Sequence, residues 1–224
     1  YFRACGKHGR RTPCLLCADN TGREGRAATF GPEGEPVMQI RHPYLMFLGD
    51  AADQLAAKTA HGIVHWRRDW CLGQLRLPDC HADLGLPEMS ISDAAAAGVR
   101  TLVIGVANRG GVVGENWIST ILAALEAGMD IASGLHTRVA DIPVVRDAAQ
   151  AHGQQIFDVR HPDRSFEVGT GARRAGKRLL AVGTDCSVGK MYTALAIEKE
   201  LTSRGVNGDF RARGQTGIFI AGEG

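Results

Sequence analysis

Apolar residues between positions 38 and 165 form short continuous runs that alternate with segments of helical spacing. The runs predict strands at 44–48, 101–107, 129–132 and 155–159. The continuous run at 101–107 suits a strand buried on both faces. The segments between them predict helices, at 51–60, 90–97, 118–127 and 142–152. Gly62, Gly98 and Gly128 are placed to end three of these helices. A repeated order of strand and helix predicts a parallel sheet with right-handed crossovers, and therefore an α/β, Rossmann-like domain.

A second strand and helix pattern follows a stretch rich in Gly, Arg and Lys. Residues 179–182 predict a short strand, and the apolar positions 191, 194, 197 and 201 predict one face of a helix. Residues 209–213 predict a further strand. We expect a Rossmann-like domain at 38–165, a hinge at 166–178, and the start of a P-loop NTPase-like α/β domain at 179–224 that is truncated within this sequence.

The first 37 residues show neither pattern. Cys5, His8, Cys14 and Cys17 have the spacing C-x2-H-x5-C-x2-C, which offers four ligand types that zinc accepts. The gap between the two halves is too short for the usual pair of zinc knuckles. We favour the alternative that this segment is an unstructured or non-native extension, fused to a natural start at Met38, and we assign no metal.

Charge and hydropathy exclude several classes of protein. Basic residues number 26 and acidic residues 24, and their small excess lies in the first 36 positions. The remainder has no basic stripe with interleaved aromatic residues, so we expect no nucleic-acid partner. No apolar run approaches the roughly 20 residues of a membrane span, and we see no signal peptide. We expect a cytoplasmic protein with reduced cysteines that acts on a small molecule, while homo-oligomer formation stays open.

The residues between the predicted strand at 179–182 and the next helix read Gly-Thr-Asp-Cys-Ser-Val-Gly-Lys. Glycines allow a tight turn that aims backbone N–H groups inward, and a helix N-terminus and a lysine add positive charge. We therefore predict a phosphate-binding P-loop. Together with the later Gly-Gln-Thr-Gly segment, the expected cofactor-binding residues are Gly183, Thr184, Asp185, Cys186, Ser187, Val188, Gly189, Lys190, Met191, Thr193, Gln215 and Thr216.

This loop departs from the common pattern G-x-x-x-x-G-K-[ST] in two ways. Five residues separate its glycines, and Met191 stands where a hydroxyl usually binds Mg²⁺. Thr184 and Thr193 are possible substitutes, but metal-assisted ATP hydrolysis fits poorly. Cys186 lies near a helix N-terminus and a lysine, as nucleophilic cysteines do, although we prefer to interpret it as a small loop residue.

A second candidate site lies at the carboxyl ends of the strands in the first domain. Ligands bind there in open parallel sheets, so the loops 105–114, 133–138 and 160–163 should share one rim. Asn108, Arg109 and Arg138 are candidates for binding a substrate carboxylate. His136 and Asp141 are candidates for a catalytic base and its orienting group, although a lone histidine beside a strand is more often structural.

Beyond the P-loop alone, the whole stretch from about Met38 to Gly224 resembles the D-glutamate N-acetyltransferase family, which was once catalogued only as a domain of unknown function. The P-loop itself is similar to that of dethiobiotin synthetase. The resemblance implies a Rossmann-like domain followed by a P-loop domain, and acetyl transfer from acetyl-CoA to the amine of an acidic D-amino acid in D-amino-acid catabolism. Methionine after the P-loop lysine is usual in this family. The resemblance rests on 43–50, 101–107, 130–136, 183–192 and 214–218.

Two other functions remain open at this point. One is an ATP-dependent ligase or synthetase of the dethiobiotin synthetase type, which would need Mg²⁺ and ATP as cofactors. The other is a regulatory module that binds a nucleotide without chemistry. An assay for bound ligand and product would distinguish the three functions.

Overall fold

The computed structural model describes residues 38–107, 109–162, 168, 170–172, 176–185, 188–212 and 214–223. The chain divides into two compact units. The sheet unit comprises Gln39–Val168 and Ala212–Gly224, and the loop-helix unit comprises Tyr1–Met38 and Gly169–Arg211. The two are described separately below.

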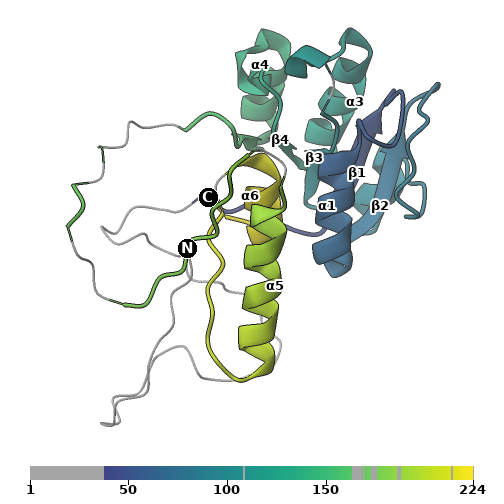
Figure 1. Ribbon diagram of the computed structural model, residues 1–224. Helices are drawn as coiled ribbons and strands as arrows, with labels where there is room; N and C mark the ends of the chain where they lie inside the picture. The colour runs from purple at the N-terminus through teal and green to yellow at the C-terminus, as the bar shows by residue number, and fades with distance from the viewer. Residues whose placement is uncertain are drawn as a thin grey trace, which may run out of the picture. The chain divides into compact units, whose positions relative to one another are not determined.

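The sheet unit is built on a five-stranded parallel sheet of order β2-β1-β3-β4-β5 (Figure 1). Its strands are β1 (Tyr44–Gly49), β2 (Cys71–Arg76), β3 (Thr101–Ile104), β4 (Asp130–Ser133) and β5 (Ile156–Asp158). Every residue of β1, β3 and β4 is buried. Strands buried on both faces are the physical reason for the continuous apolar runs in the sequence, because neither face meets water.

Helices cover both faces of this sheet. They are α1 (Lys58–Trp66), α2 (Ile91–Ala96), α3 (Glu115–Glu126), α4 (Pro143–His152) and α6 (Gln215–Ala221), with short 3₁₀ turns η1 (Arg68–Trp70), η2 (Arg109–Gly111) and η3 (Val139–Asp141). The chain moves from β1 to β2 in one direction and from β2 through β5 in the other. Right-handed crossovers then place α1 on one face and α2, α3 and α4 on the opposite face. Contacts agree with this arrangement, since α3 packs against α2 and α4. Figure 1 shows α3 beside α4, and α1 beside α6, against which it packs.

The helix expected at 51–60 is the clearest difference from the sequence prediction. Helix α1 begins only at Lys58 and continues to Trp66, so Gly62 is a buried residue inside it rather than its end. The carbonyl of Ala56 accepts the N–H of Ala107 at 2.7 Å, and the N–H of Ala60 donates to the carbonyl of Gly105 at 3.1 Å. These backbone groups bind the loop after β3, and they are therefore not available to extend the helix backward.

Strand β2 was not predicted. Its six residues alternate irregularly between buried and half-buried positions, so they form no continuous apolar run. Its Gln74 is buried because the side chain is fully hydrogen bonded: Nε2 donates to Asp83 Oδ1 at 2.9 Å and to Glu88 Oε1 at 2.7 Å, and Oε1 accepts the Leu84 N–H at 2.8 Å. A glutamine satisfied in this way can occupy an otherwise apolar position.

Residues near the end of the sequence fold with the sheet unit. Ile40 N–H donates to the carbonyl of Gly222 at 2.9 Å, and the buried Tyr44 hydroxyl donates to the carbonyl of Phe219 at 3.5 Å. Gln39 and Glu223 form an isolated antiparallel bridge. Helix α6 is thereby held beside the start of β1, next to α1.

The loop-helix unit contains helix α5 (Lys190–Ser203), which confirms the helix predicted after the P-loop. The strands expected at 179–182 and 209–213 are not formed in the residues that the structure describes. The side chains of Leu179, Leu180 and Val182 are 44%, 56% and 77% exposed. A strand is stable only when neighbouring strands satisfy its N–H and C=O groups, and no described strand pairs with this segment.

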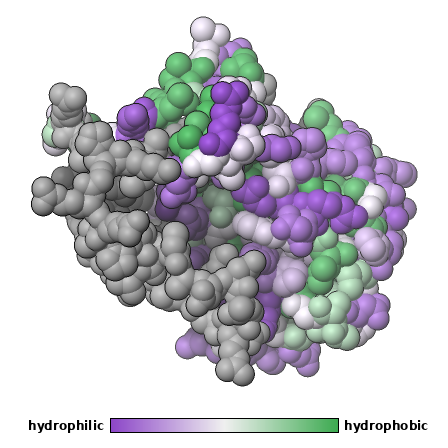
Figure 2. Space-filling view, turned by 90° about the horizontal axis from the view of Figure 1, so that it is seen from below, coloured by the Kyte–Doolittle hydropathy of each residue, from purple (hydrophilic) through white to green (hydrophobic). Residues whose placement is uncertain are grey.

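The surface of the sheet unit is mostly polar where Figure 2 shows it. Hydrophilic residues are spread over the right half of that view, and hydrophobic residues appear between them in separate smaller areas. Among the described residues, no helix combines the length and the apolar character needed to cross a bilayer.

Candidate functional site

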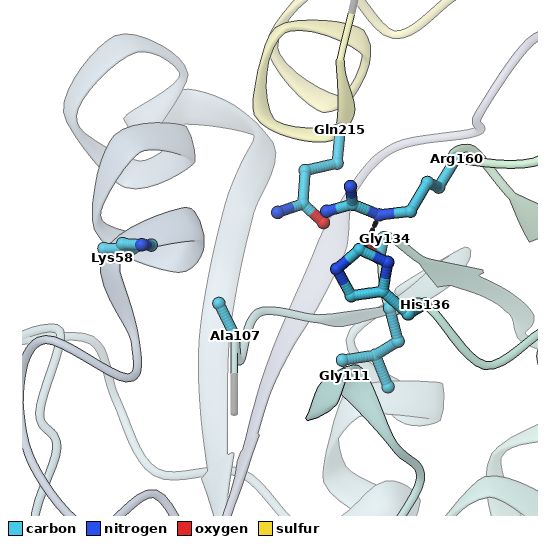
Figure 3. Close-up of a pocket in the computed structure, with 8 residues that line it drawn as sticks. Lys58, Ala107, Gly111, Gly134, His136, Arg160 and Gln215 are labelled. Carbon is cyan, nitrogen blue, oxygen red and sulfur yellow. Dashed lines mark hydrogen bonds between the residues drawn. The ribbon is translucent and has the colours of Figure 1, made fainter. Parts of the chain in front are cut away.

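The sheet unit contains a cavity of about 230 Å³. Figure 3 shows Lys58 on one side of it and the side chains of His136, Arg160 and Gln215 gathered on the other. The lining residues are Lys58, Ala107, Gly111, Gly134, Leu135, His136, Arg160 and Gln215. The cavity is smaller than the roughly 300–1,000 Å³ of sites for drug-sized ligands, so it suits a small metabolite.

The position of the cavity follows from the sheet topology. Ala107 and Gly111 follow β3, His136 follows β4, and Arg160 follows β5, so the carboxyl ends of three adjacent strands supply one wall each. Lys58 is the first residue of α1 and Gln215 the first residue of α6. In parallel sheets of this order, ligands bind outside the carboxyl ends of the strands.

Backbone contacts hold the loops of the cavity in place. Thr137 N–H donates to the carbonyl of Gly111 at 2.9 Å, which joins the loop after β4 to the loop after β3. Arg160 Nε donates to the carbonyl of Gly134 at 3.0 Å, and His161 Nε2 lies 2.9 Å from the carbonyl oxygen of His136. Both contacts tie the loop after β5 to the loop after β4, so the rim is a connected structure.

Two glycines are required by close approach at this rim. A Cβ built on Gly111 would lie 2.6 Å from His136 Cδ2 and 2.8 Å from the His136 backbone nitrogen, and its φ is +60°. A Cβ built on Gly134 would lie 2.1 Å from Gln215 Oε1 and 2.6 Å from Gln215 Cβ. Any side chain at either position would displace a residue of the cavity wall.

The cavity is electropositive. Lys58 and Arg160 bring two cationic groups, and none of the described residues that line the cavity is acidic. Within the described ranges, the ammonium of Lys58 has no hydrogen bond or ion pair. The Arg160 guanidinium is bound there only by the Gly134 carbonyl. Cationic groups without acidic partners around a small cavity favour an anionic ligand, and a guanidinium binds carboxylates with two parallel hydrogen bonds.

The two residues of the predicted catalytic pair, His136 and Asp141, have different surroundings in the structure. His136 lines the cavity, whereas Asp141 Oδ1 lies 4.0 Å from Arg138 Nε, and both of these side chains are exposed. The backbone of Arg109 forms part of η2, but its side chain lies outside the described residues, as does all of Asn108. Of the residues predicted to act in this domain whose side chains the structure describes, His136 lines the cavity and Arg138 and Asp141 do not.

The predicted P-loop lies in the loop-helix unit. Gly189 precedes α5 with φ +89°, and Thr193 donates from both its N–H and its hydroxyl to the Gly189 carbonyl, at 2.9 and 3.1 Å. The ammonium of Lys190 donates to the carbonyl of Asp185, so the lysine folds back over its own loop. A Cβ at Gly183 would lie 2.7 Å from Val188 and 3.2 Å from the Lys190 stem. This close approach is the reason for a glycine there.

The predicted cofactor-binding residues also include neighbours of these in the P-loop and in the first turn of α5. Thr184 and Asp185 are exposed in the loop, and Met191 is half-buried in the first turn of α5. Cys186 and Ser187 lie outside the described residues.

Gln215 and Thr216, the two predicted cofactor-binding residues outside the P-loop, form the start of helix α6 in the sheet unit. Lys58 and Arg160 were not predicted as site residues. Arg160 directly follows the last strand pattern, which is a signal that sequence reasoning could have used. Lys58 had no such signal, because the sequence predicts it near the end of the helix at 51–60, where a solvated polar face explains a charged residue equally well. Across the described residues, no group of three or more His, Cys, Asp or Glu side chains is arranged to hold a metal.

Comparison with known families finds two matching models. A Rossmann-like domain of unknown function, DUF1611_N, matches residues 76–162. A P-loop domain of unknown function, DUF1611, matches residues 167–224. Together they account for more than half of the sequence, in the order that the patterns predict.

Two curated proteins and one crystal structure are similar to this chain. A D-glutamate N-acetyltransferase from Tritonibacter scottomollicae is 55% identical over 185 residues, which are 83% of this chain and 56% of that protein. A D-glutamate N-acetyltransferase from a Pseudoalteromonas species is 46% identical over 187 residues, 84% of this chain and 56% of that protein. A DUF1611 family protein from Anabaena variabilis has a TM-score of 0.65 and 29% identity, over 82% of this chain and 56% of that one. The chain thus spans about half the length of the relatives it matches.

Proposed function

Because this chain belongs to the DUF1611 family, in which a Rossmann-like domain precedes a P-loop domain, we propose that the full-length protein is an N-acetyltransferase. The reaction moves the acetyl group of acetyl-CoA to the amine of an acidic D-amino acid, D-glutamate. The observation that carries the proposal is the 55% identity to a protein named D-glutamate N-acetyltransferase. We also propose a cytoplasmic location, together with the domain boundaries near 38, 165 and 179.

The cavity of the sheet unit supports a role in binding the acceptor. It is small, it contains two cations, and no described residue that lines it carries a negative charge. Glutamate is small and carries two carboxylates and one ammonium group, so its carboxylates match the Lys58 and Arg160 side chains. Gln215 offers an amide for further hydrogen bonds.

His136 is the candidate for the base. Acyl transfer to an amine requires a free lone pair on nitrogen, so an ammonium substrate must first lose a proton. The imidazole lines the cavity beside Arg160 and Gln215 (Figure 3), where it can accept that proton. The amine then attacks the thioester carbonyl and the C–S bond breaks. The second proton of the attacking nitrogen goes to the departing thiolate, which leaves as free CoA.

The P-loop supports the choice of acetyl donor. CoA carries a pyrophosphate and a ribose phosphate, and the start of α5 with Lys190 has the features of a phosphate site. Glycine at 189 and the close packing of Gly183 against the Lys190 stem shape this turn. We assign the Gly183–Lys190 loop to the phosphates of acetyl-CoA.

An acetylation assay on the full-length protein tests the proposal. We expect N-acetyl-D-glutamate and free CoA in equal amounts, and a loss in kcat of about 100- to 10,000-fold in His136→Gln, the typical contribution of a general base. The control is His152→Gln on the exposed end of α4, which should keep wild-type activity. Failure of the wild-type protein to release CoA with D-glutamate would overturn the proposed function, and an active His136→Gln variant would overturn the choice of base.

A further inference from the structure

The proposed function leaves open which carboxylate of the acceptor Lys58 binds. Lys58 lies on the opposite side from His136, Arg160 and Gln215 (Figure 3). We propose that Lys58 binds the side-chain carboxylate of the acceptor amino acid and so selects glutamate over amino acids without a negatively charged side chain. This inference rests on the proposed function.

The start of α1 is held firmly against the sheet. Ala107 N–H donates to Ala56 O at 2.7 Å and Ala60 N–H to Gly105 O at 3.1 Å, on either side of Lys58. A Cβ on Gly105 would lie 2.5 Å from Ala60 Cβ, so helix and strand end are in close contact. The backbone of Lys58 is therefore fixed relative to the loop after β3, and only its side chain is free to adjust to a ligand.

The local charge around Lys58 is unusual. A lysine in the first turn of a helix lies at the positive end of the helix dipole, where acidic residues are favoured. Helix α1 has no acidic residue in its first turn. Among the described residues no carboxylate pairs with the Lys58 ammonium. An anion bound in the cavity would be attracted both by the ammonium and by this helix end.

The orientation of the substrate follows from the positions of the other groups. In an α-amino acid the amine and the α-carboxylate share one carbon atom, so the carboxylate must lie near whichever group deprotonates the amine. Arg160, which Gly134 O holds through Nε at 3.0 Å, is beside His136 and is placed to bind the α-carboxylate. The second carboxylate of glutamate then points across the cavity toward Lys58.

These two cations consequently have different tasks. Arg160 binds the group that every amino acid has, and its loss should weaken all acceptors alike. Lys58 binds the side-chain carboxylate that distinguishes glutamate from glutamine, and loss of Lys58 should weaken the binding of the charged acceptor only. Selectivity between D-glutamate and D-glutamine therefore separates this role from a general effect on the cavity.

The experiment measures kcat/KM of the full-length protein for D-glutamate and D-glutamine. We expect Lys58→Met to lower kcat/KM for D-glutamate about 10- to 100-fold, the range for one charge-assisted contact, and to change D-glutamine less than about threefold. Lys58→Arg keeps the charge and should retain most of the preference for D-glutamate. Lys58→Glu should lower kcat/KM for D-glutamate further, because like charges then face each other.

Arg100→Met is the matched control. It also removes one exposed cation from the sheet unit, but it precedes β3 at the amino edge of the sheet, away from the cavity. Arg100→Met should leave kcat/KM for both amino acids unchanged. Thermal unfolding of each variant checks that the variant is folded.

An equal loss for D-glutamate and D-glutamine in a folded Lys58→Met protein would overturn the assignment of Lys58. Unchanged activity on D-glutamate would overturn it as well. A wild-type protein that acetylates neither amino acid would instead refute the proposed function itself.

Discussion

Asp50 illustrates how one exposed side chain can support the packing of a buried one. Its Oδ1 accepts the indole N–H of Trp117 at 2.8 Å, and its Oδ2 accepts the Asn116 amide at 3.1 Å. Trp117 is 2% exposed. The hydrogen bond from Trp117, with a smaller contribution from Asn116, lowers the pKa of Asp50 below its ordinary value. The carboxylate form is thus favoured in the folded protein.

This gives a stability prediction with a defined dependence on pH. A lowered folded pKa stabilises the protein above the unfolded pKa, about 3.9, and that contribution is lost as the pH falls through the folded pKa. We expect Asp50→Ala to lower the free energy of unfolding by about 1–3 kcal/mol at pH 7, because the Trp117 N–H loses its partner. Urea denaturation should show this difference narrowing as the pH falls below the unfolded pKa of about 3.9 and through the lowered folded pKa.

The control for that measurement is Asp69→Ala in η1, whose side chain is exposed. It should change the free energy of unfolding by less than about 0.5 kcal/mol at either pH. A constant difference between wild type and Asp50→Ala across the pH range would contradict the ionic part of the contact.

At the scale of the element, the rim loops depend on glycines that leave room for His136, the proposed base. We expect Gly111→Ala to lower kcat/KM for D-glutamate about 10- to 100-fold, since its Cβ would push His136 out of position. It should also cost about 1–2 kcal/mol of stability, because alanine is strained at φ +60°.

Gly128→Ala separates these two effects. Its φ is +86°, and nothing lies within 4 Å of a built Cβ, so it carries the backbone strain without the collision. We expect a similar loss of stability in chemical denaturation and full activity. Equal activities of the two variants would show that the His136 position tolerates the displacement.

Elements whose pattern is strictly local were predictable. Ser90 caps α2 in both directions with Asp93, as a serine before an apolar segment suggests, and β1, β3 and β4 follow their apolar runs. Strand β2 and the true start of α1 were not predictable, because both depend on contacts outside their own segment. Gln74 depends on Asp83 and Glu88, which lie 9 and 14 residues away, and Ala56 depends on Ala107. The hydrophobic pattern within a segment does not reveal such contacts.

At the scale of the whole molecule, the two predicted sites fall in different compact units. The cavity with His136 belongs to the sheet unit, and the P-loop with Lys190 belongs to the loop-helix unit. The rim of the first site was predictable from topology, since the carboxyl ends of parallel strands share an edge. The contributions of Lys58 and Gln215 were not, because folding alone brings these distant positions to one cavity.

This division predicts that the two substrates can be perturbed separately. We expect Lys190→Ala to raise the KM for acetyl-CoA about tenfold or more through loss of a charged phosphate contact, while the KM for D-glutamate stays near wild type. Steady-state kinetics with each substrate varied in turn measures both values. Lys199→Ala, exposed further along α5, is the control. A rise in the D-glutamate KM alone would contradict the assignment of the P-loop to acetyl-CoA.

The contact between Gly134 and Gln215 has a consequence for how this protein can evolve. The Gln215 side chain occupies the space beside Gly134, and its Cβ would lie only 2.6 Å from a Cβ added at 134. Position 134 therefore cannot accept a side chain unless the residue at 215 moves or changes as well. The two sites should therefore drift together among descendants of this gene, as a pair separated by more than a third of the chain.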